Sequence, residues 1–407
     1  MKKIEGGITA AKGFLATSCE AGIKYKDRTD MAMVFCKEDT VCAGTFTSNV
    51  VKAACVQWDM KLNESGKPLH AVVINSGIAN ACTGKEGFEA CERTAKSVEA
   101  ALGVPYDTVA VASTGVIGMQ LPVDKLTDGV RKMAGTLDDS IEAGTAASKA
   151  IMTTDTINKE IAVSFEVGGT TVTLGGMSKG SGMIHPNMCT MLAFLSSDVA
   201  INKELLQEAV SDVVSDTFNM ITVDGDTSTN DTLMIMCNGL AGNKKITEHG
   251  ADYDEFKAAL RYVCEYLAKR MAGDGEGATK LFEAHVVNAK CKEDAKTLAR
   301  AVVASNLSKA AIYGCDANFG RFLCAMGYSG ALFEQEDVEL YFESDAGRLK
   351  VFDHGTPIVF DEEEALKILK CDAVTVYIDM NEGEAEATAW GCDLTYDYVK
   401  INADYRS

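Results

Sequence analysis

The sequence has few basic residues and few prolines for its length of 407 residues. Its 39 Lys and Arg residues are outnumbered by 59 Asp and Glu residues, which leaves a formal net charge of −20. A surface this acidic repels phosphate backbones and anionic lipids, so we expect neither nucleic acid nor a membrane surface as a partner. Five prolines, against 36 glycines, exclude collagen-like and proline-rich disordered classes of protein.

Long apolar runs are also missing. No stretch approaches the roughly 18 consecutive apolar residues that a membrane-spanning helix needs. The N-terminal sequence MKKIEGGITAAKGF lacks the apolar segment of a secretory signal. Together these absences predict a cytoplasmic protein.

The 14 cysteines and five histidines are not spaced as metal ligands. No two cysteines form a CxxC pair and the histidines are scattered singly, so we expect no metal site. Cys36 and Cys237 lie inside apolar runs, where a thiol acts as a small buried hydrophobe. A chain of this size does not need disulfides for stability, so we expect reduced thiols.

The length and the hydrophobic pattern predict an α/β protein of two packed domains or one large unit. Apolar residues from Phe88 to Leu102 recur at spacings of three and four, which predicts a helix. The runs 31–36 and 41–48, separated by polar residues, predict a hairpin. The glycine-rich stretch 271–280 suggests a domain boundary near 280. Further strands are expected at 70–77, 108–113, 160–176, 191–195, 232–237 and in the last third of the chain, with helices near 122–135, 138–151, 202–219, 252–270, 293–304 and 362–370.

Two glycine-containing motifs fail as ligand loops. The sequence GDGEGATK ends in Thr279-Lys280 and not in the Gly-Lys-Ser/Thr of a phosphate-binding loop. The sequence DGDTSTND has Ser228 and Thr229 at positions where a calcium loop needs a ligand and a glycine. Neither nucleotide nor calcium binding is therefore expected from them.

The segment KGSGMIHPNMCT, residues 179–190, contains a candidate nucleophile. If the bond between Cys189 and Thr190 were cut, Thr190 would carry both a hydroxyl and a free α-amine. An α-amine has a pKa near ~7.7–8, so it can accept the hydroxyl proton at neutral pH. The alternative is a Gly/Pro-rich surface loop that enters a strand.

Such a nucleophile needs donors for a tetrahedral oxyanion and groups that hold the acyl donor. In the element ASTGVIG, Gly115 allows close backbone approach and the Thr114 hydroxyl can donate a hydrogen bond. Thr153 belongs to the hydroxyl cluster MTTDT at the end of a predicted helix. A plain strand-to-helix turn and simple helix capping are the structural alternatives for these two elements.

Taken together, seven motifs in this order resemble ornithine acetyltransferase, the glutamate N-acetyltransferase family of cyclic arginine biosynthesis. The resemblance covers essentially the whole chain. The motifs are AVVINSGIANACTG (71–84), ASTGVIG (112–118), IMTTDT (151–156), KGSGMIHPNMCTML (179–192), DGDTSTND (224–231), GDGEGATK (273–280) and NADYRS (402–407).

The resemblance implies the fold and processing of N-terminal-nucleophile enzymes. The fold would be an αββα-type layered sandwich with a smaller C-terminal α/β domain. Self-cleavage between Cys189 and Thr190 would give chains 1–189 and 190–407, which assemble as an α2β2 heterotetramer. Within the second chain, residues 190–280 would complete the sandwich and residues 281–407 would form the C-terminal domain.

The family reaction moves an acetyl group from N2-acetylornithine to glutamate through an acetyl-threonine, with no metal or organic cofactor. Thr190 would be the nucleophile, and Thr114 and Gly115 the oxyanion hole. Some members also take acetyl-CoA as a co-substrate. Many members have Ala where this chain has Cys189, and Asn where it has Ile78. The implied substrate contacts are Thr153, Lys179, Thr190, Glu276, Asn402 and Ser407.

Two other functions stay open on the residues alone. A related self-processing aminopeptidase or amidase would pass the acyl group to water. A non-catalytic amino-acid-binding protein could use the same scaffold without cleavage.

Overall fold

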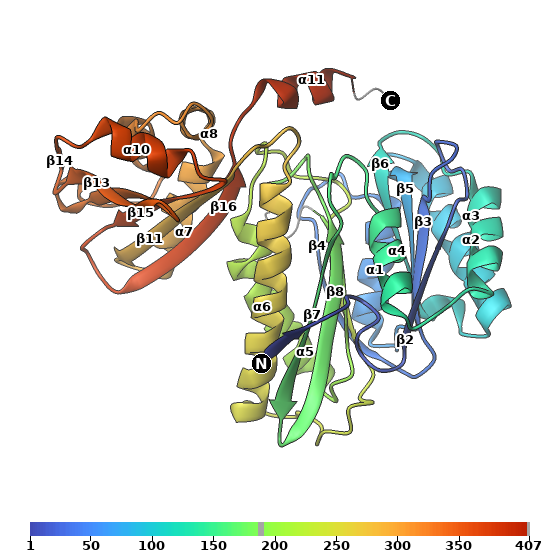
Figure 1. Cartoon of the computed structure of the whole chain (residues 1–407). Coiled ribbons are helices and arrows are strands. Elements are labelled where there is room, and N and C mark those ends of the chain that lie inside the picture. The colour runs from blue at the N-terminus through green and yellow to red at the C-terminus, as the bar shows by residue number, and fades with distance from the viewer. Residues whose placement is uncertain (186–190, 405–407) are drawn as a thin grey trace.

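The computed structural model describes residues 1–185 and 191–404, which form three β-sheets flanked by helices (Figure 1). Thr190, Cys189 and Ser407 lie outside the described residues. Within the described ranges, no helix is long and apolar enough to cross a membrane.

The first sheet has six strands in the order β1-β7-β8-β9-β10-β4. Its β7–β8 hairpin turns at Gly168 and Gly169, both with positive φ, as the glycine pair in the sequence predicts. Strands β9 and β10 pair in parallel and are buried throughout, which explains their continuous apolar sequences. The strands are β1 (Lys2–Ile4), β4 (Val41–Phe46), β7 (Lys159–Val167), β8 (Thr170–Lys179), β9 (Leu192–Ser197) and β10 (Thr232–Cys237).

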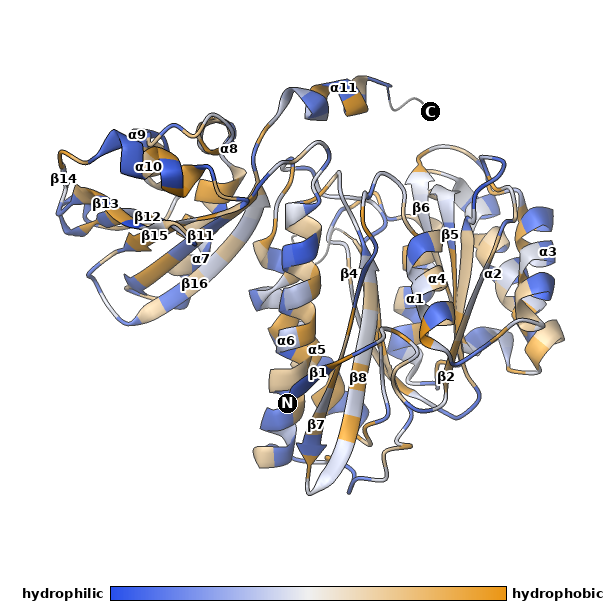
Figure 2. Ribbon diagram, in the orientation of Figure 1, coloured by the Kyte–Doolittle hydropathy of each residue, from blue (hydrophilic) through white to orange (hydrophobic). Residues whose placement is uncertain are grey.

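The second sheet has four strands in the order β2-β3-β5-β6. Helices α2 and α3 pack against it and against each other, and they carry hydrophilic residues along their length (Figure 2). The apolar stripe from Phe88 to Leu102 is therefore the face that α2 turns to the sheet. The elements are β2 (Phe14–Cys19), β3 (Met31–Cys36), β5 (Ala71–Ile78), β6 (Val109–Val116), α2 (Gly84–Leu102) and α3 (Val123–Ala134).

Alternating side chains of the first sheet contribute to two different cores. Leu192 and Phe194 of β9 join the core of the second sheet. Ala193 and Leu195 point the other way, into the core formed with helices α5 (Lys203–Asp216) and α6 (Ala251–Gly273). The layers are thus helix, sheet, sheet and helix. This confirms the expected α/β sandwich.

Two further helices lie between the sheets at their margins. Helix α1 (Ala54–Ser65) packs against β6 and β4, and helix α4 (Ile141–Ala150) packs against β2 and β3. The Trp58 indole N–H of α1 donates to the Val109 carbonyl of β6, 2.9 Å away. These helices therefore cover the edge strands of the second sheet.

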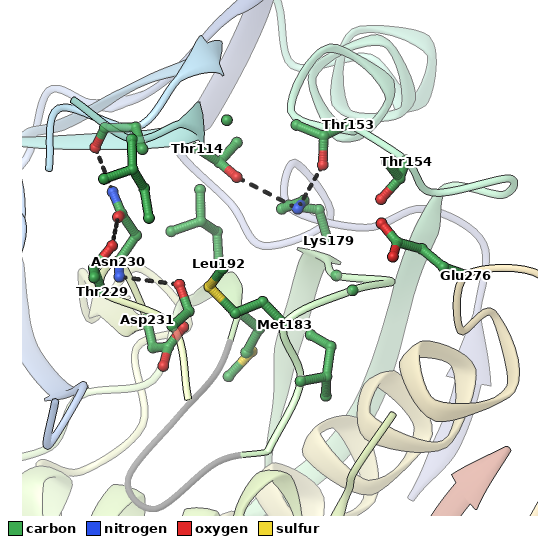
Figure 3. A pocket seen from close by; sticks show the side chains of 18 of the residues that line it. Thr114, Thr153, Thr154, Lys179, Met183, Leu192, Thr229, Asn230, Asp231 and Glu276 are labelled. Atoms are coloured by element: carbon green, nitrogen blue, oxygen red, sulfur yellow. Dashed lines mark hydrogen bonds between the residues drawn. The ribbon is translucent and has the colours of Figure 1, made fainter. Parts of the chain in front are cut away.

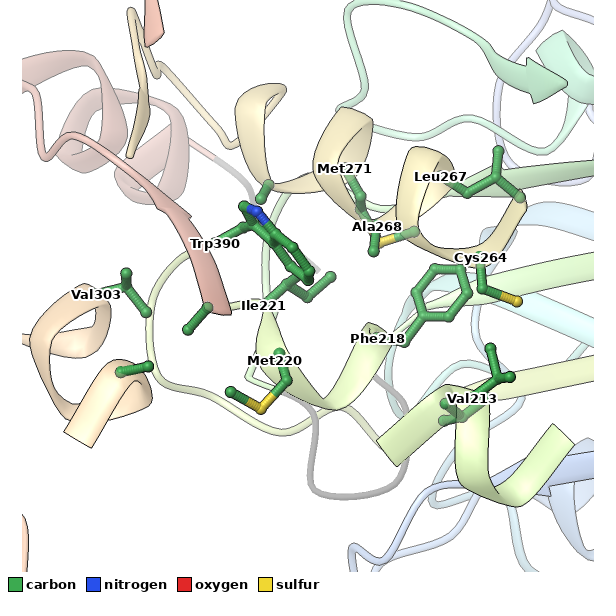
Figure 4. Close-up of a cluster of buried hydrophobic side chains, with 14 of the residues drawn as sticks. Val213, Phe218, Met220, Ile221, Cys264, Leu267, Ala268, Met271, Val303 and Trp390 are labelled. Atoms are coloured by element: carbon green, nitrogen blue, oxygen red, sulfur yellow. The ribbon is translucent and has the colours of Figure 1, made fainter. Parts of the chain in front are cut away.

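The C-terminal part forms a third sheet in the order β14-β13-β12-β15-β11-β16, which begins directly after the glycine-rich stretch 271–280. Trp390 of β16 packs beside Ile221 in an apolar cluster that α6 also enters (Figure 4). This cluster joins the C-terminal sheet to the sandwich. The elements are β11 (Leu281–Ala289), β12 (Glu339–Ser344), β13 (Gly347–Asp353), β14 (Thr356–Pro357), β15 (Ala373–Asp379), β16 (Ala385–Cys392), α7 (Lys292–Ala304), α8 (Asn306–Tyr313), α9 (Phe319–Gly327) and α10 (Glu362–Leu369).

The last helix, α11 (Tyr396–Asp404), leaves the C-terminal sheet and extends back toward the sandwich (Figure 1). It has no fully buried residue. The Tyr398 hydroxyl donates to Asp224 Oδ2 at 3.3 Å. Burial and the neighbouring Asp224 carboxylate raise the pKa of Tyr398, so the phenol stays protonated and can keep this bond.

The hairpin expected from residues 31–48 is wrong. Strand β3 pairs with β2 and β5 in the second sheet, whereas β4 pairs with β10 in the first. The short polar link between them therefore crosses from one sheet to the other. Apolar runs of this kind predict strands but not their partners, because any strand of the buried sheets can supply the same apolar contacts.

Helix α1 carries a fully buried carboxyl group, Asp59, that has one hydrogen bond, from the Val111 amide at 2.9 Å. Burial raises the pKa of Asp59 well above its usual range. The unfolded chain releases this proton near pH 4, and the folded chain only at higher pH. The stability that Asp59 contributes in acid is therefore lost as pH rises, by about 1.4 kcal/mol per unit between the two pKa values.

Replacing Asp59 with asparagine should flatten this pH dependence, because the amide keeps the acceptor for Val111 and carries no charge. The measurement is the thermal midpoint of both proteins from pH 5 to pH 8. We expect the difference between variant and wild type to shift in favour of the variant as pH rises. Parallel pH profiles would contradict a buried, protonated Asp59.

Candidate active site

A pocket of about 140 Å³ lies where the ends of β6 and β8 approach the loop before β10 (Figure 3). Met191 and Leu192, which follow Thr190 in the sequence, also line it. The predicted residues Cys189, Thr190 and Ser407 lie outside the described residues. The other predicted site residues all line this one pocket: Thr114, Gly115, Thr153, Lys179, Glu276 and Asn402.

Gly115 sits at an irregular point of the pairing between β5 and β6, opposite Gly77. Its φ is +134°, and a Cβ atom there would lie 2.2 Å from the Gly77 carbonyl carbon. No side chain fits, so only glycine permits this close approach of the two strands. The register of the two strands shifts at this point, next to the pocket that Gly115 lines.

The Lys179 ammonium, at the end of β8, lies between two threonine hydroxyls (Figure 3). Its Nζ is 2.9 Å from Thr153 Oγ1 and 3.4 Å from Thr114 Oγ1. An ammonium can only donate, so the hydroxyl hydrogens of both threonines remain available for another acceptor. The pocket thus combines a buried positive charge with O–H groups that can donate to an oxyanion.

Behind Lys179 lies a buried group of charges. Lys159, with a fully buried side chain, bridges Asp155 at 2.8 Å and Asp274 at 2.6 Å. Asp155 Oδ2 is 3.7 Å from Lys179 Nζ, and Asp155 Oδ1 accepts from the Gly180 amide at 2.6 Å. Burial would raise the pKa of Asp155, but the positive charges of Lys179 and Lys159 and these hydrogen bonds outweigh it. The pKa of Asp155 therefore lies well below its usual range, and the carboxylate stays ionised.

Hydrogen bonds link Asp274 of this buried group to Glu276 on the far side of the pocket. The Ser181 hydroxyl donates to the Asp274 carbonyl at 2.7 Å, and the Glu276 amide donates to the Ser181 carbonyl at 2.9 Å. A Cβ atom on Gly182 would lie 2.4 Å from the Glu276 carboxylate, so glycine leaves room for that acid. The pocket thus presents a positive Lys179 and a negative Glu276.

The C-terminal helix α11 reaches this pocket through Asn402. The Asn402 amide donates to Glu276 Oε2 at 2.7 Å. An amide can thereby orient the carboxylate while leaving its other oxygen free. The expectation that the tail returns to the site therefore agrees with the position of Asn402.

A group of possible metal ligands lies in the C-terminal domain, away from this pocket. The side chains of Glu339, Asp353 and His354 approach one another closely enough to share an ion. Lys350 already pairs with both carboxylates, at 2.9 Å from Glu339 Oε2. The group is therefore a partly exposed ion-pair network.

Sequence reasoning missed several residues of the site. Asp155 and Asn230 belong to the motifs IMTTDT and DGDTSTND, but the residues that they contact in the fold were not predictable from the sequence. Lys159 and Asp274 are 115 residues apart and carry no local signal. Ile78, the other departure from the family pattern, is 2% exposed and packs in the apolar core of the second sheet.

Comparison with known proteins identifies the family. A family model described as the ArgJ family matches residues 15–407. The chain belongs to the ArgJ family. Relatives named arginine biosynthesis bifunctional protein ArgJ share 49% identity in Symbiobacterium thermophilum and 43% in Bacillus subtilis, with all of this chain covered and 100% and 98% of theirs. The resemblance to ornithine acetyltransferases is thereby confirmed.

Two solved structures of relatives match about half of this family member each. The structure of the bifunctional protein argJ from Bacillus halodurans is 45% identical and covers 52% of this chain and 98% of that chain, with a TM-score of 0.50. The ornithine acetyltransferase from Mycobacterium tuberculosis, solved with ornithine, is 42% identical and covers 46% of this chain and 96% of that chain, with a TM-score of 0.42.

Proposed function

We propose that this protein is a self-cleaving acetyltransferase that moves the acetyl group of N2-acetyl-L-ornithine to L-glutamate. The observation that carries the proposal is the pocket, in which Thr114, Gly115, Lys179 and Glu276 surround the approach to β9. Family membership supports the reaction, and the residues that line the pocket match the polar groups that it requires.

The proposed nucleophile is Thr190, freed by cleavage of the Cys189–Thr190 bond into chains 1–189 and 190–407. The solved Bacillus halodurans chain supports such a cleavage, because nearly its whole length corresponds to about half of this chain. Full-length relatives, in contrast, match from end to end. Cys189 contributes only its carbonyl to the bond, so its small side chain is compatible with cleavage.

In the acetylation step, the Thr190 α-amine takes the proton of its own hydroxyl as Oγ1 attacks the acetyl carbonyl carbon. The Gly115 amide and the Thr114 hydroxyl would donate to the oxyanion, and the nearby Lys179 charge favours that negative charge. The C–N bond to ornithine then breaks, and the departing amine receives the proton from the Thr190 ammonium. Attack by the glutamate amine on acetyl-Thr190 reverses these steps and yields N-acetylglutamate.

The two amino-acid substrates share an α-carboxylate and differ in side-chain charge. Lys179 can pair with the shared carboxylate, with the Thr153 hydroxyl beside it. Glu276, oriented by Asn402, can meet the ammonium of the ornithine side chain. Thr190 and Ser407 complete the proposed set of contacts.

The assembly that we propose is an α2β2 heterotetramer in the cytoplasm. Residues 190–280 would belong to the catalytic sandwich of the second chain and 281–407 to its C-terminal domain. Neither a metal nor an organic cofactor takes part in the proposed chemistry. The relatives' name, bifunctional, supports acetyl-CoA as a second donor.

An acetyl-transfer assay tests this function. Purified protein with acetylornithine should form N-acetylglutamate only when glutamate is present. Release of acetate at the same rate without glutamate would identify a hydrolase, and no turnover of acetylornithine would leave a binding protein. A parallel reaction with acetyl-CoA and glutamate measures the second activity.

Replacing Glu276 with glutamine should raise the KM for acetylornithine about 10–100-fold, since a hydrogen bond between charged groups contributes about 1.5–3 kcal/mol. The KM for glutamate should change much less, because its side chain is negative. Asn402→Asp, which sets a second carboxylate beside Glu276, should leave the preference for a cation intact. Equal increases in both KM values for Glu276→Gln would remove the assigned role.

A further inference from the structure

We infer that Asn230 is a positioning residue. It fixes the position of the strand that carries the oxyanion hole, β6, relative to the strand that follows the nucleophile, β9. The inference rests on the proposed function and adds a residue that neither the family motifs' expected roles nor the ligand contacts include.

The two halves of the site belong to different sheets. Thr114 and Gly115 stand on β6 of the second sheet, whereas Thr190 precedes β9 of the first. Sheets that pack face to face share no ladder of backbone hydrogen bonds. Attack and charge stabilisation must nevertheless occur at one carbonyl group, so the distance between these strands needs to be held.

Asn230 is tied to the strand that follows the nucleophile. It lies just before β10, which runs parallel to β9 with Thr232 opposite Leu192. The Thr232 amide donates to the Met191 carbonyl at 2.8 Å. A displacement of the segment before β10 would therefore move Met191, the residue that follows Thr190 in the sequence.

The Asn230 side chain reaches across to the second sheet. Its Nδ2 donates to the Ser113 carbonyl at 2.8 Å and to the Ala79 carbonyl at 2.5 Å. Ser113 immediately precedes Thr114, and the Ala79 amide donates to Val116 at the end of β6. One bond therefore holds the backbone just before the oxyanion-hole residues, and the other holds Ala79, which is bonded to the backbone just after them.

The orientation of the amide is defined by a third bond. Thr229 Oγ1 donates to Asn230 Oδ1 at 2.6 Å (Figure 3). The side chain is only 7% exposed, so water cannot replace these partners freely. A carboxylate at this position would aim lone pairs at two carbonyl oxygens and would repel the end of β6.

Loss of this connection should act on kcat. Misplacement of a catalytic group by about 1 Å costs roughly 10²-fold in rate, and removal of one oxyanion donor costs 10²–10³-fold. Asn230 also lines the pocket, but its side-chain amide is already bonded to Thr229, Ala79 and Ser113, and it points away from Lys179 and Glu276, the groups proposed to bind substrate. The KM for acetylornithine should therefore change much less than kcat. A fall in kcat with little change in KM therefore distinguishes a positioning role from a role in substrate binding.

The test compares Asn230→Asp with Asn243→Asp in the acetylornithine-to-glutamate assay. Asn243 is a matched control: it is 6% exposed, its amide donates to the Ala200 and Lys244 carbonyls, and it lies beyond the opposite end of β10. We expect Asn230→Asp to lower kcat about 10–100-fold per folded, cleaved molecule, with KM for acetylornithine within about threefold of wild type. Asn243→Asp should lower the thermal midpoint and keep kcat.

Equal loss of kcat in the two variants, or a raised KM with unchanged kcat in Asn230→Asp, would overturn the inference. If Asn230→Asp does not fold or is not cleaved, Thr229→Val serves as the milder change, because it keeps Asn230 but removes the hydroxyl that orients its amide. It should lower kcat severalfold, and an unchanged kcat would count against the inference. Absence of transfer by the wild-type protein would instead refute the proposed function.

Discussion

Thr190→Ala should yield one uncleaved chain that transfers no acetyl group. Alanine has no hydroxyl to attack the Cys189 carbonyl, so cleavage cannot begin, and the chain would then lack both the nucleophile and its α-amine. Loss of a covalent nucleophile typically removes roughly 10⁴-fold or more of the rate. Intact-mass measurement and N-terminal sequencing report the cleavage, and N-acetylglutamate formation reports the transfer.

Thr190→Ser provides the matched control. Serine keeps the hydroxyl and the future α-amine, so this variant should be cleaved and retain measurable transfer. Cleavage of Thr190→Ala at the same bond would show that another group attacks it. Full transfer by an uncleaved wild-type chain would exclude the N-terminal threonine mechanism.

Lys159→Met should be the most destabilising single substitution near the pocket. The methionine fills a similar volume but leaves Asp155 and Asp274 buried without their shared cation. Removing one partner of a buried ion pair costs about 3–5 kcal/mol because the remaining charge is uncompensated. The exposed pair of Lys67 with Asp107 offers a control, and Lys67→Met should cost less than about 1 kcal/mol.

The deficit of Lys159→Met should also depend on pH. In the wild type, the depressed pKa of Asp155 contributes stability above its unfolded pKa, and this is lost as pH falls below about 4. Lys159→Met has less of this contribution to lose. The difference in free energy of unfolding between the variant and the wild type should therefore become smaller in acid. Chemical unfolding at pH 3 and pH 7 measures the two free energies of unfolding. A deficit below 1 kcal/mol, or one that is constant with pH, would contradict the charge network.

Much of the secondary structure was predictable because its signals are local. The apolar run Thr232–Cys237 forms β10 over the predicted residues, and the Phe88–Leu102 stripe lies on α2. The pairing of strands was not predictable to the same degree. Residues 31–36 and 41–46 are close in sequence but lie in different sheets: β3 pairs with its sequence neighbours β2 and β5, whereas β4 pairs with the distant β10.

Helix α1 was missed for a related reason. It has a buried Asp59 and a weakly segregated apolar face, since it lies between two sheets and packs on more than one side. Its periodicity therefore resembles neither an ordinary amphipathic helix nor a strand. The acid is explained only by its contact with the Val111 amide of β6.

The shortage of basic residues and the spacing of the cysteines exclude several classes of protein, and the seven ordered motifs sufficed to point to the family. The nucleophile Thr190 remains a prediction of the sequence. Chemical identity and short spacing carry that information without a fold. Only the tertiary structure decided how Lys159 joins Asp155 to Asp274 and how Asn230 reaches Ser113, 117 residues away. These contacts form only when the two sheets pack together. Burial then strengthens the few long-range ion pairs and hydrogen bonds that fix the charges and positions of the site residues.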